Sequence, residues 1–206
     1  MNHIPSYQPK SYNLLAIDPG TNQMGVSIFA VDMVAFKIQK IRSWTIGVKE
    51  LKNETGLVEE FHSASFLKLM KIKKVIGDLL VEENIHHVAY EAPFMGMLQP
   101  SAYGPLVALM TIVHMSVVEF GQDVRFTIFP PQTVKKSIGV AGKKGKEVVL
   151  EAIKNIPAIM IALQEGHCQL DDLDNNAVDS VAVGYTAVES ELFRELKLCP
   201  IQDVPF

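Results

Sequence analysis

Cysteine is scarce in this sequence, and no set of residues suggests a covalent nucleophile. The 206 residues include two cysteines, Cys168 and Cys199. Two cysteines are too few for a disulfide framework and show no zinc-type pairing, so we expect packing residues in a reducing compartment. No Ser/His/Asp or Cys/His arrangement stands out, and His86, His87 and His114 lie in apolar segments where a packed histidine is expected.

Targeting signals and long hydrophobic runs are not apparent either. The first 13 residues lack the basic region and apolar core of a secretory signal. Residues 92–118 contain no Asp, Glu, Lys or Arg, but prolines and glycines interrupt them. The apolar stretch from Pro105 to Val118 is shorter than the roughly 20 residues that a bilayer requires. We interpret it as a buried helix and predict a protein without membrane contact.

Neither repeats nor linkers divide the chain. Hydrophobic residues make up 48% and charged residues 20% of the 206 residues. This length and composition are typical of one globular domain of about 100 to 250 residues. No low-complexity tract marks a boundary, so the sequence predicts a single domain over residues 1–206.

Positive charge is low on average but concentrated in one segment. The formal net charge is −4, so the average surface does not indicate a polyanionic ligand. Residues 125–154, the basic segment, nevertheless contain seven Lys or Arg and two acidic residues, a local net of +5 that leaves −9 for the rest of the chain. Gly139, Gly142 and Gly145 let the backbone approach a phosphate chain. The basic segment is either a nucleic-acid contact or a flexible lysine-rich loop without a ligand.

The order of the predicted elements indicates an α/β fold. A three-stranded meander comes first, and strands then alternate with helices, which is the plan of an α/β sheet with helices on both faces. In chain order we expect strands at 14–17, 24–31 and 34–46, a helix at 58–84, a strand at 87–91, a helix at 102–118, a strand at 124–129, and helices from 132 onward, the last at about 175–191.

Three acidic residues lie where apolar elements rarely carry a charge. Asp18 ends the first strand, Glu91 ends the fourth, and Asp179 lies inside the apolar run of the last helix. A carboxylate against a core is costly unless it is paired or coordinates a metal. If the first and fourth strands are neighbours, the three carboxylates surround one point, and such hard oxygen ligands suit Mg²⁺ or Mn²⁺. For any one of these acids alone, a cap or a solvated strand end is the alternative.

The start of the last helix adds polar residues. Asn176 and Asn175 precede Asp179 by three and four residues and share its face of the helix, and Asn176 is the preferred site residue. A helix dipole by itself favours negative charge at its N-terminus. We expect this favourable interaction with the helix dipole, rather than metal binding, to explain at least two of the three aspartates Asp171, Asp172 and Asp174.

Four segments of the sequence form one ordered pattern. They are Ile17-Asp18-Pro19-Gly20-Thr21 with Gly25, Tyr90-Glu91-Ala92-Pro93-Phe94-Met95, Pro131-Gln132-Thr133-Val134-Lys135 with Lys146, and Asn176-Ala177-Val178-Asp179-Ser180-Val181-Ala182. In this order they resemble the four signature regions of RuvC-type Holliday junction resolvases, over about residues 12–190. The first segment alone also resembles the phosphate loop of actin-like ATPases and sugar kinases.

The resemblance implies a fold, an activity and a set of residue roles. The fold is α/β and RNase H-like, with a mixed five-stranded sheet flanked by helices. The implied protein is a homodimeric, Mg²⁺-dependent endonuclease that binds branched DNA and nicks two opposed strands of a four-way junction, leaving 5′-phosphate and 3′-hydroxyl ends. Asp18, Glu91 and Asp179 match the catalytic carboxylates, which also hold the metal. Lys135 and Lys146 match two functional lysines, Lys146 being the catalytic one near the scissile phosphate, and Phe94 matches an aromatic wedge at the junction centre, with a core residue as the alternative.

The charge pattern adds Lys136, Lys143 and Lys144 as further DNA contacts. Two Mg²⁺ ions per active site are expected, with Mn²⁺ as a substitute. Two metals about 4 Å apart can generate a hydroxide and stabilise the leaving 3′ oxygen, with Asp18 between them. Asn176 matches the fourth metal position, where the family commonly has Asp or His. This departure removes a charge, although an amide oxygen can still coordinate; Asp174 and Asp172 are the alternatives.

Other functions stay open at this point. One is a non-catalytic or weakly catalytic protein that binds branched DNA. Another is an RNase H-like nuclease acting on flaps or structured RNA. An actin-like ATPase is disfavoured, because that fold repeats its domain and 206 residues hold one copy. We expect a cytoplasmic location, in a bacterial cell or in the host of a phage; the partner that loads the protein onto junctions is not readable from the sequence.

Overall fold

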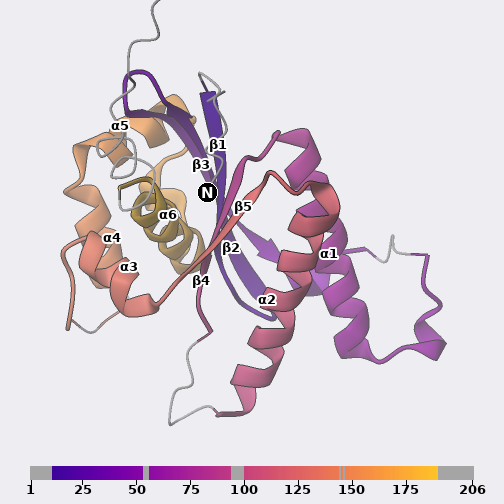
Figure 1. Cartoon of the computed structure of the whole chain (residues 1–206). Helices are drawn as coiled ribbons and strands as arrows, with labels where there is room; N and C mark the ends of the chain where they lie inside the picture. The colour runs from indigo at the N-terminus through magenta and orange to yellow at the C-terminus, as the bar shows by residue number, and fades with distance from the viewer. Residues whose placement is uncertain (1–10, 53–55, 94–99, 144, 146, 190–206) are drawn as a thin grey trace, which may run out of the picture.

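A five-stranded sheet divides the molecule into two helical layers (Figure 1). The computed structural model describes residues 11–52, 56–93, 100–143, 145 and 147–189. The elements are β1 (Ser11–Asp18), β2 (Gln23–Asp32), β3 (Lys37–Gly47), α1 (Ala64–Glu82), β4 (His87–Glu91), α2 (Pro100–Phe120), β5 (Arg125–Phe129), α3 (Pro131–Ser137), α4 (Glu147–Lys154), α5 (Pro157–Glu165) and α6 (Asn175–Ala187), with short 3₁₀ turns at Val48–Glu50, Glu59–Phe61 and Leu170–Asp172. The predicted order of strands and helices is confirmed.

The sheet is mixed, with the strand order β3-β2-β1-β4-β5. β1, β2 and β3 form the antiparallel meander, whereas β4 runs parallel to both β1 and β5. Ile17 pairs with Tyr90 across β1 and β4, so Asp18 and Glu91 follow one position later at the same edge. The predicted mixed five-stranded α/β sheet is therefore confirmed, and its first and fourth strands are neighbours.

Alternation along the strands sends the two strand-end acids to the same face of the sheet. Ala16 packs in the core on the side of α3 to α6, and Ile17 packs in the core on the side of α1 and α2. Because successive side chains alternate, Asp18 lies on the α6 side. Ala89 of β4 also packs in the α6-side core, so Glu91 lies on that side too.

The N-terminal part of the predicted helix at 58–84 does not join α1. The side chain of Ser63 accepts a hydrogen bond from the backbone N–H of Phe66 at 3.2 Å, which caps α1 and starts it at Ala64. The phenylalanines expected on the apolar face are exposed instead, Phe61 by 78% and Phe66 by 41%. The helix prediction was wrong before Ala64, because the apolar spacing continued past Ser63, the residue that caps the helix. Phe66 lies within α1, and only its expected burial was wrong.

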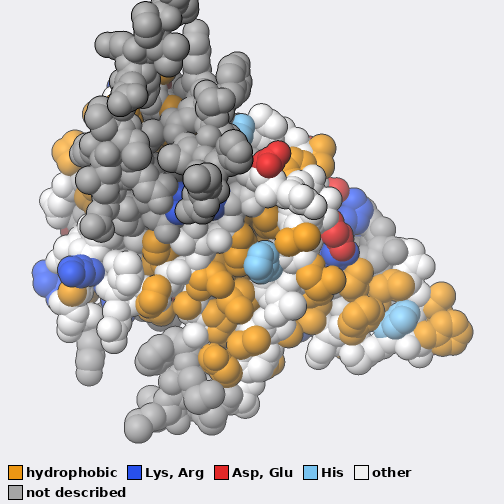
Figure 2. Space-filling model, in the orientation of Figure 1, with side chains coloured by type: hydrophobic (Ala, Val, Ile, Leu, Met, Phe, Trp, Pro, Cys, Tyr) orange, Lys and Arg blue, Asp and Glu red, His pale blue; other side chains and the backbone are white. Residues whose placement is uncertain are grey.

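Helix α2 was predicted to be buried, and within a single chain this is wrong for most of its surface. Leu109, Val113 and Val117 form a buried stripe against α1 and the sheet. Met115 and Val118 are 47% and 61% exposed, and hydrophobic side chains gather over this part of the molecule (Figure 2). Among the described residues, α2 is the one helix long and apolar enough to cross a membrane by length and composition alone, and 22% of its window Tyr103–Phe120 is buried.

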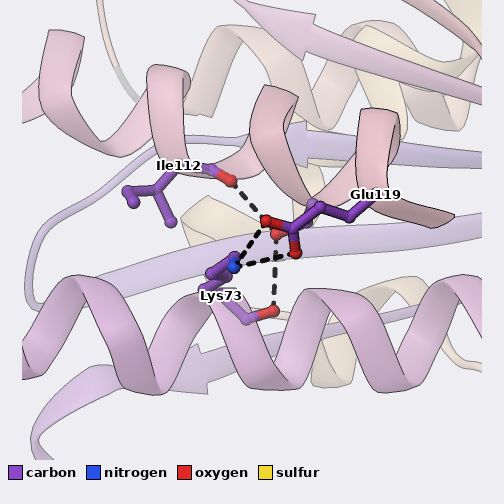
Figure 3. Close-up of polar contacts among 4 residues, drawn as sticks. Lys73, Ile112 and Glu119 are labelled. Atoms are coloured by element: carbon purple, nitrogen blue, oxygen red, sulfur yellow. Dashed lines mark hydrogen bonds and ion pairs between the residues drawn. The ribbon is translucent and has the colours of Figure 1, made fainter.

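Polar contacts fix which side of α2 faces inward (Figure 3). Lys73 of α1 forms an ion pair with Glu119 of α2 at 2.8 Å. The Ser116 hydroxyl lies 3.4 Å from the backbone oxygen of Lys73 and donates to that of Ile112 at 3.0 Å. These contacts and the buried stripe hold one side of α2 on α1, so its other apolar side faces outward.

The cysteines and histidines follow the packing prediction in part. Cys168 is a half-buried free thiol that packs against the α6-side core, and Cys199 lies outside the described residues. His87 is fully buried. His114 is exposed and stacks on Phe126, with 4.3 Å between the ring centroids, so the expectation of a packed histidine was wrong at this position.

Candidate active site

Three carboxylates approach one another at one edge of the sheet. Asp18 and Glu91 come from the ends of β1 and β4, and α6 packs over β1 and β2 on the same face. Asp179 lies in α6 and interacts electrostatically with both Asp18 and Glu91. Segments more than 150 residues apart in the sequence therefore supply one acidic cluster.

Burial and like charge shift the acidity of this cluster. The pKa of Asp18 is raised from 3.8 to about 8. Burial is the largest cause of this rise, and the negative charges of Glu91, Asp179 and Asp174, in that order, supply the rest. The pKa of Glu91 is raised from 4.5 to about 7. Burial is the largest cause, the negative charge of Asp179 contributes to the rise, and the positive charge of Lys135 opposes it. The cluster is costly to ionise without a compensating cation.

Helix α6 is seated on β2 at a residue that has no side chain. A Cβ at Gly25 would lie 1.9 Å from the backbone oxygen of Asn176. Gly25 pairs with Asp18 across β1 and β2. The glycine of the first motif therefore lets the start of α6 lie directly beside the strand that carries Asp18.

A buried network of serine hydroxyls also anchors α6, and sequence reasoning missed it. Ser27 of β2 lies 2.8 Å from Ser43 of β3 and 2.6 Å from Ser180 of α6, measured between Oγ atoms. Ser43 donates to the backbone oxygen of Ala177 at 2.9 Å. Spacing in the sequence could have indicated these serines. Ser27 is two residues from Gly25 and therefore lies on the same face of β2, and Ser180 directly follows the candidate site residue Asp179.

Asp174 serves as the N-cap of α6. Its Oδ1 accepts from the backbone N–H of Ala177 at 3.0 Å and also from the Thr45 hydroxyl. Asp171 forms an ion pair with Lys154 at 3.1 Å. Structural roles thus account for Asp171 and Asp174, two of the three aspartates at the start of the helix. The charge of Asp174 also contributes to the raised pKa of Asp18.

Asn176 is half-buried on the first turn of α6. Its Nδ2 donates to the side-chain Oε1 of Gln23, the first residue of β2, at 3.4 Å. Gln23 was not among the residues selected from the sequence. The strand period could have indicated it, because Gln23 and Gly25 are two residues apart in β2 and therefore share a face.

One lysine of the basic segment acts on the carboxylates. Lys135 and Lys136 are exposed on α3, and the charge of Lys135 reaches Glu91. Lys143 is exposed beyond α3, whereas Lys154 is paired with Glu151 and Asp171. The remaining predicted DNA contacts, Phe94, Lys144 and Lys146, lie outside the described residues.

A hollow of about 560 Å³ lies between α4 and the segment that follows α3. Its lining combines apolar side chains such as Val140 and Val148 with the charged Lys143, Glu147 and Glu151. None of Asp18, Glu91 and Asp179 lines it, so this hollow is separate from the acidic cluster.

The donor set suits a hard divalent cation. Within the described part of the chain, no three His, Cys, Asp or Glu side chains lie together closely enough to hold a metal ion as they stand. The side chains of Asp18, Glu91, Asp179 and Asn176 nevertheless offer oxygen donors, which Mg²⁺ and Mn²⁺ prefer. Burial first, and neighbouring negative charge second, raise the pKa values of Asp18 and Glu91, and a bound cation would offset both effects. By donor type and charge, these residues fit such an ion.

Comparisons with known proteins identify the fold. No protein-family model and no curated protein sequence matches the chain. The Thermus thermophilus RuvC structure matches 90% of this chain and 96% of its own, with a TM-score of 0.60 and 16% identity. T. thermophilus RuvC in complex with a Holliday junction substrate matches 88% and 96%, with a TM-score of 0.62 and 18% identity.

The yeast mitochondrial Holliday junction resolvase Ydc2 is also similar. It matches 94% of this chain and 85% of its own length, with a TM-score of 0.58 and 13% identity. Identities this low establish a common fold rather than a common activity. The chain therefore has the RNase H-like fold of RuvC-type Holliday junction resolvases, the family that its sequence motifs resemble.

Proposed function

We propose that this protein is a metal-dependent endonuclease that resolves four-way DNA junctions. One observation carries the proposal: Asp18, Glu91 and Asp179 form an acidic cluster at one sheet edge of a resolvase fold. One of the similar structures holds a Holliday junction substrate, which suggests the substrate class. The four motifs resembling RuvC-type resolvases point to the same activity.

The carboxylates and Asn176 are the proposed metal ligands. When bound, two Mg²⁺ ions, or Mn²⁺ in their place, would supply an activated water and positive charge near the leaving 3′ oxygen. Asp18 interacts with both Glu91 and Asp179, which supports its role as the shared ligand. In the proposed hydrolysis, the water oxygen would bond to phosphorus and the P–O3′ bond would break, with a proton taken up by O3′, so the products would be 5′-phosphate and 3′-hydroxyl ends.

The basic segment is the proposed DNA contact. Lys135 and Lys136 are exposed, and the charge of Lys135 reaches the carboxylate cluster, so a phosphate attracted to α3 lies near the reacting groups. Lys146 is proposed to stabilise the charge of the reacting phosphate. Lys143, Lys144 and the aromatic ring of Phe94 complete the proposed contact with the junction.

A homodimer is the proposed functional unit. Two opposed nicks require two active sites, and a two-fold dimer supplies them. The outward side of α2 is the proposed interface, because Met115 and Val118 are exposed there and Ile128 of the edge strand β5 is 41% exposed. A two-fold contact would bury this apolar surface against its own copy.

The direct test is cleavage of a labelled four-way junction. We expect paired nicks with Mg²⁺ or Mn²⁺, none in EDTA, and lower activity on flaps and structured RNA. Asp18→Asn should bind the junction normally and cleave it at least about 100-fold more slowly. Asp32→Asn is the matched control, because Asp32 caps the exposed β2–β3 turn at the other end of β2 and should leave cleavage unchanged. Parental cleavage by Asp18→Asn would refute the assigned site.

A branched-DNA binding protein with little catalysis is the second candidate. The neutral amide of Asn176 favours it, because an amide holds a divalent cation less tightly than a carboxylate does. Tight junction binding in EDTA, with no cleavage across a wide range of Mg²⁺ and Mn²⁺ concentrations, would establish this second function.

A further inference from the structure

The amide of Asn176 has two unlike ends, and only one of them binds a cation. Oδ1 is a hydrogen-bond acceptor and can coordinate a metal ion, whereas Nδ2 is a donor and cannot. A carboxylate at the same position offers an oxygen in either orientation. An asparagine therefore needs a neighbour that fixes which end faces the cation.

Every second residue of β2, from Gln23 to Ser27, contacts the N-terminal half of α6. The Gln23 side chain meets the side chain of Asn176, with 3.4 Å between Oε1 and Nδ2. Gly25 meets the backbone of Asn176, and the Ser27 hydroxyl lies 2.6 Å from that of Ser180. Because these three β2 residues share one face of the strand, β2 fixes the position of the helix backbone that carries Asn176.

We propose that Gln23 is a positioning residue that presents the amide oxygen of Asn176 to the bound cation. The inference rests on the metal-dependent function proposed above. With the backbone of Asn176 held at Gly25, rotation of its side chain is the freedom that remains. The hydrogen bond from Nδ2 to Gln23 assigns the nitrogen end to β2 and leaves Oδ1 as the end that ligates. Gln23 acts through Asn176 and does not itself touch the cation.

Cation binding by the full-length protein tests this role without measuring cleavage. Gln23→Met keeps the side-chain length and removes the acceptor. We expect its affinity for Mn²⁺, measured by titration calorimetry without DNA, to fall by about 2- to 10-fold, the range of one hydrogen bond. Its melting temperature in EDTA should match the parent, because Gln23 is exposed.

The matched control is Gln39→Met. Gln39 is also an exposed glutamine of the meander, and its Nε2 donates to Asp32 at 3.0 Å, near the β2–β3 turn at the other end of β2. We expect unchanged Mn²⁺ affinity for this variant. An equal loss in Gln23→Met and Gln39→Met would overturn the proposal, because it would show a general effect of the substitution.

The Asn176→Asp background separates orientation from other effects. A carboxylate needs no orienting neighbour, so Gln23→Met should change Mn²⁺ affinity there by less than about 1.5-fold, within the usual error of additivity. An equal loss in both backgrounds, or no loss in either, would overturn the role of Gln23. Failure of the parental protein to bind Mn²⁺ at all would instead refute the proposed function, and this inference with it.

Discussion

The first turn of α6 touches the backbone of β2 at Gly25, where a Cβ would lie 1.9 Å from the carbonyl oxygen of Asn176. Gly25 is also the partner of Asp18 across the β1–β2 ladder. One glycine therefore sets how closely the helix bearing Asn176 and Asp179 approaches the strand bearing Asp18. The constraint is lack of room, since the atoms that a side chain would meet belong to the backbone.

Gly25→Ala should lower both stability and cleavage. The new methyl group forces α6 away from β2, and overpacking of this kind costs about 1–3 kcal/mol or more. The free energy of unfolding from urea titration checks the first effect, and junction cleavage checks the second. Gly77→Ala in α1 is the control with the opposite sign: nothing lies within 4 Å of its Cβ, so it should gain about 0.5–1 kcal/mol. A Gly25→Ala protein as stable as the parent would contradict the close packing.

Metal-free stability should fall as the pH rises above 6.5. The pKa of Asp18 is raised from 3.8 to about 8 in the folded protein, so between these values the folded state binds more protons than the unfolded state, and stability decreases with pH. Burial lowers the pKa of His87 to about 3, which has the opposite effect, but only below its unfolded value of 6.5. The range from pH 6.5 to 8.5 therefore isolates the carboxylates.

Asp18→Asn removes the cost of ionising this buried acid. In EDTA at pH 8 the variant should melt above the parent, by about 2–4 °C for each 1 kcal/mol gained, and its stability should depend less on pH. Excess Mn²⁺ should raise the melting temperature of the parent more than that of the variant. A variant that melts below the parent at pH 8 would show that Asp18 is not held in an unfavourable environment.

Asn176→Asp should lower the Mg²⁺ concentration needed for half-maximal cleavage. The substitution restores a charged oxygen ligand in place of an amide, and charged ligands bind Mg²⁺ more tightly. Asn175→Asp, one residue earlier on α6, is the matched control and should shift the metal dependence less. An unchanged Mg²⁺ requirement in Asn176→Asp would remove this residue from the metal site.

Among the lysines of the basic segment, Lys143 should contribute mainly to DNA binding and Lys146 mainly to cleavage. Lys143→Ala should weaken junction binding and reduce the salt slope by about one unit, with cleavage at saturation nearly intact. Lys146→Ala should slow single-turnover cleavage with binding nearly intact, because its charge counts more in the transition state. Lys154→Ala, which removes a lysine already paired with Glu151 and Asp171, should change both least. Identical profiles for Lys143→Ala and Lys146→Ala would contradict the assignment.

The exposed side of α2 should mediate dimerisation. Val118→Glu places a charge where a two-fold contact would bury apolar surface, and should yield a monomer that cuts one strand per encounter. Light scattering at micromolar concentration and a paired-nick assay check the two effects. Val81→Glu on α1 is the control, because Val81 is 66% exposed and lies outside α2. A monomeric parent with full paired cleavage would refute the dimer.

Short sequence patterns were enough to predict most of the strands and helices and the three acidic site residues. The apolar run over residues 24–31 and the Pro19-Gly20 break are enough to define two strands and a turn, and Asp18, Glu91 and Asp179 were identified as charges within or at the ends of apolar elements. These signals work because side-chain period and turn chemistry act over a few residues. They fail at α1, where the hydroxyl of Ser63 ends a spacing that looked continuous.

Contacts between distant segments were decided only by the tertiary structure. The outward side of α2 is exposed because the buried stripe of Leu109, Val113 and Val117 and the Lys73–Glu119 ion pair hold the other side on α1 and the sheet. The sequence of this mainly apolar helix does not indicate which side that is. Likewise, Gln23 meets Asn176 across 153 residues of sequence because β2 and α6 pack together. The sequence by itself determined which groups carry charge and where strands end. The burial of Asp18 and Glu91 and their distances from other charges, and hence their raised pKa values, depend on packing that no local pattern encodes.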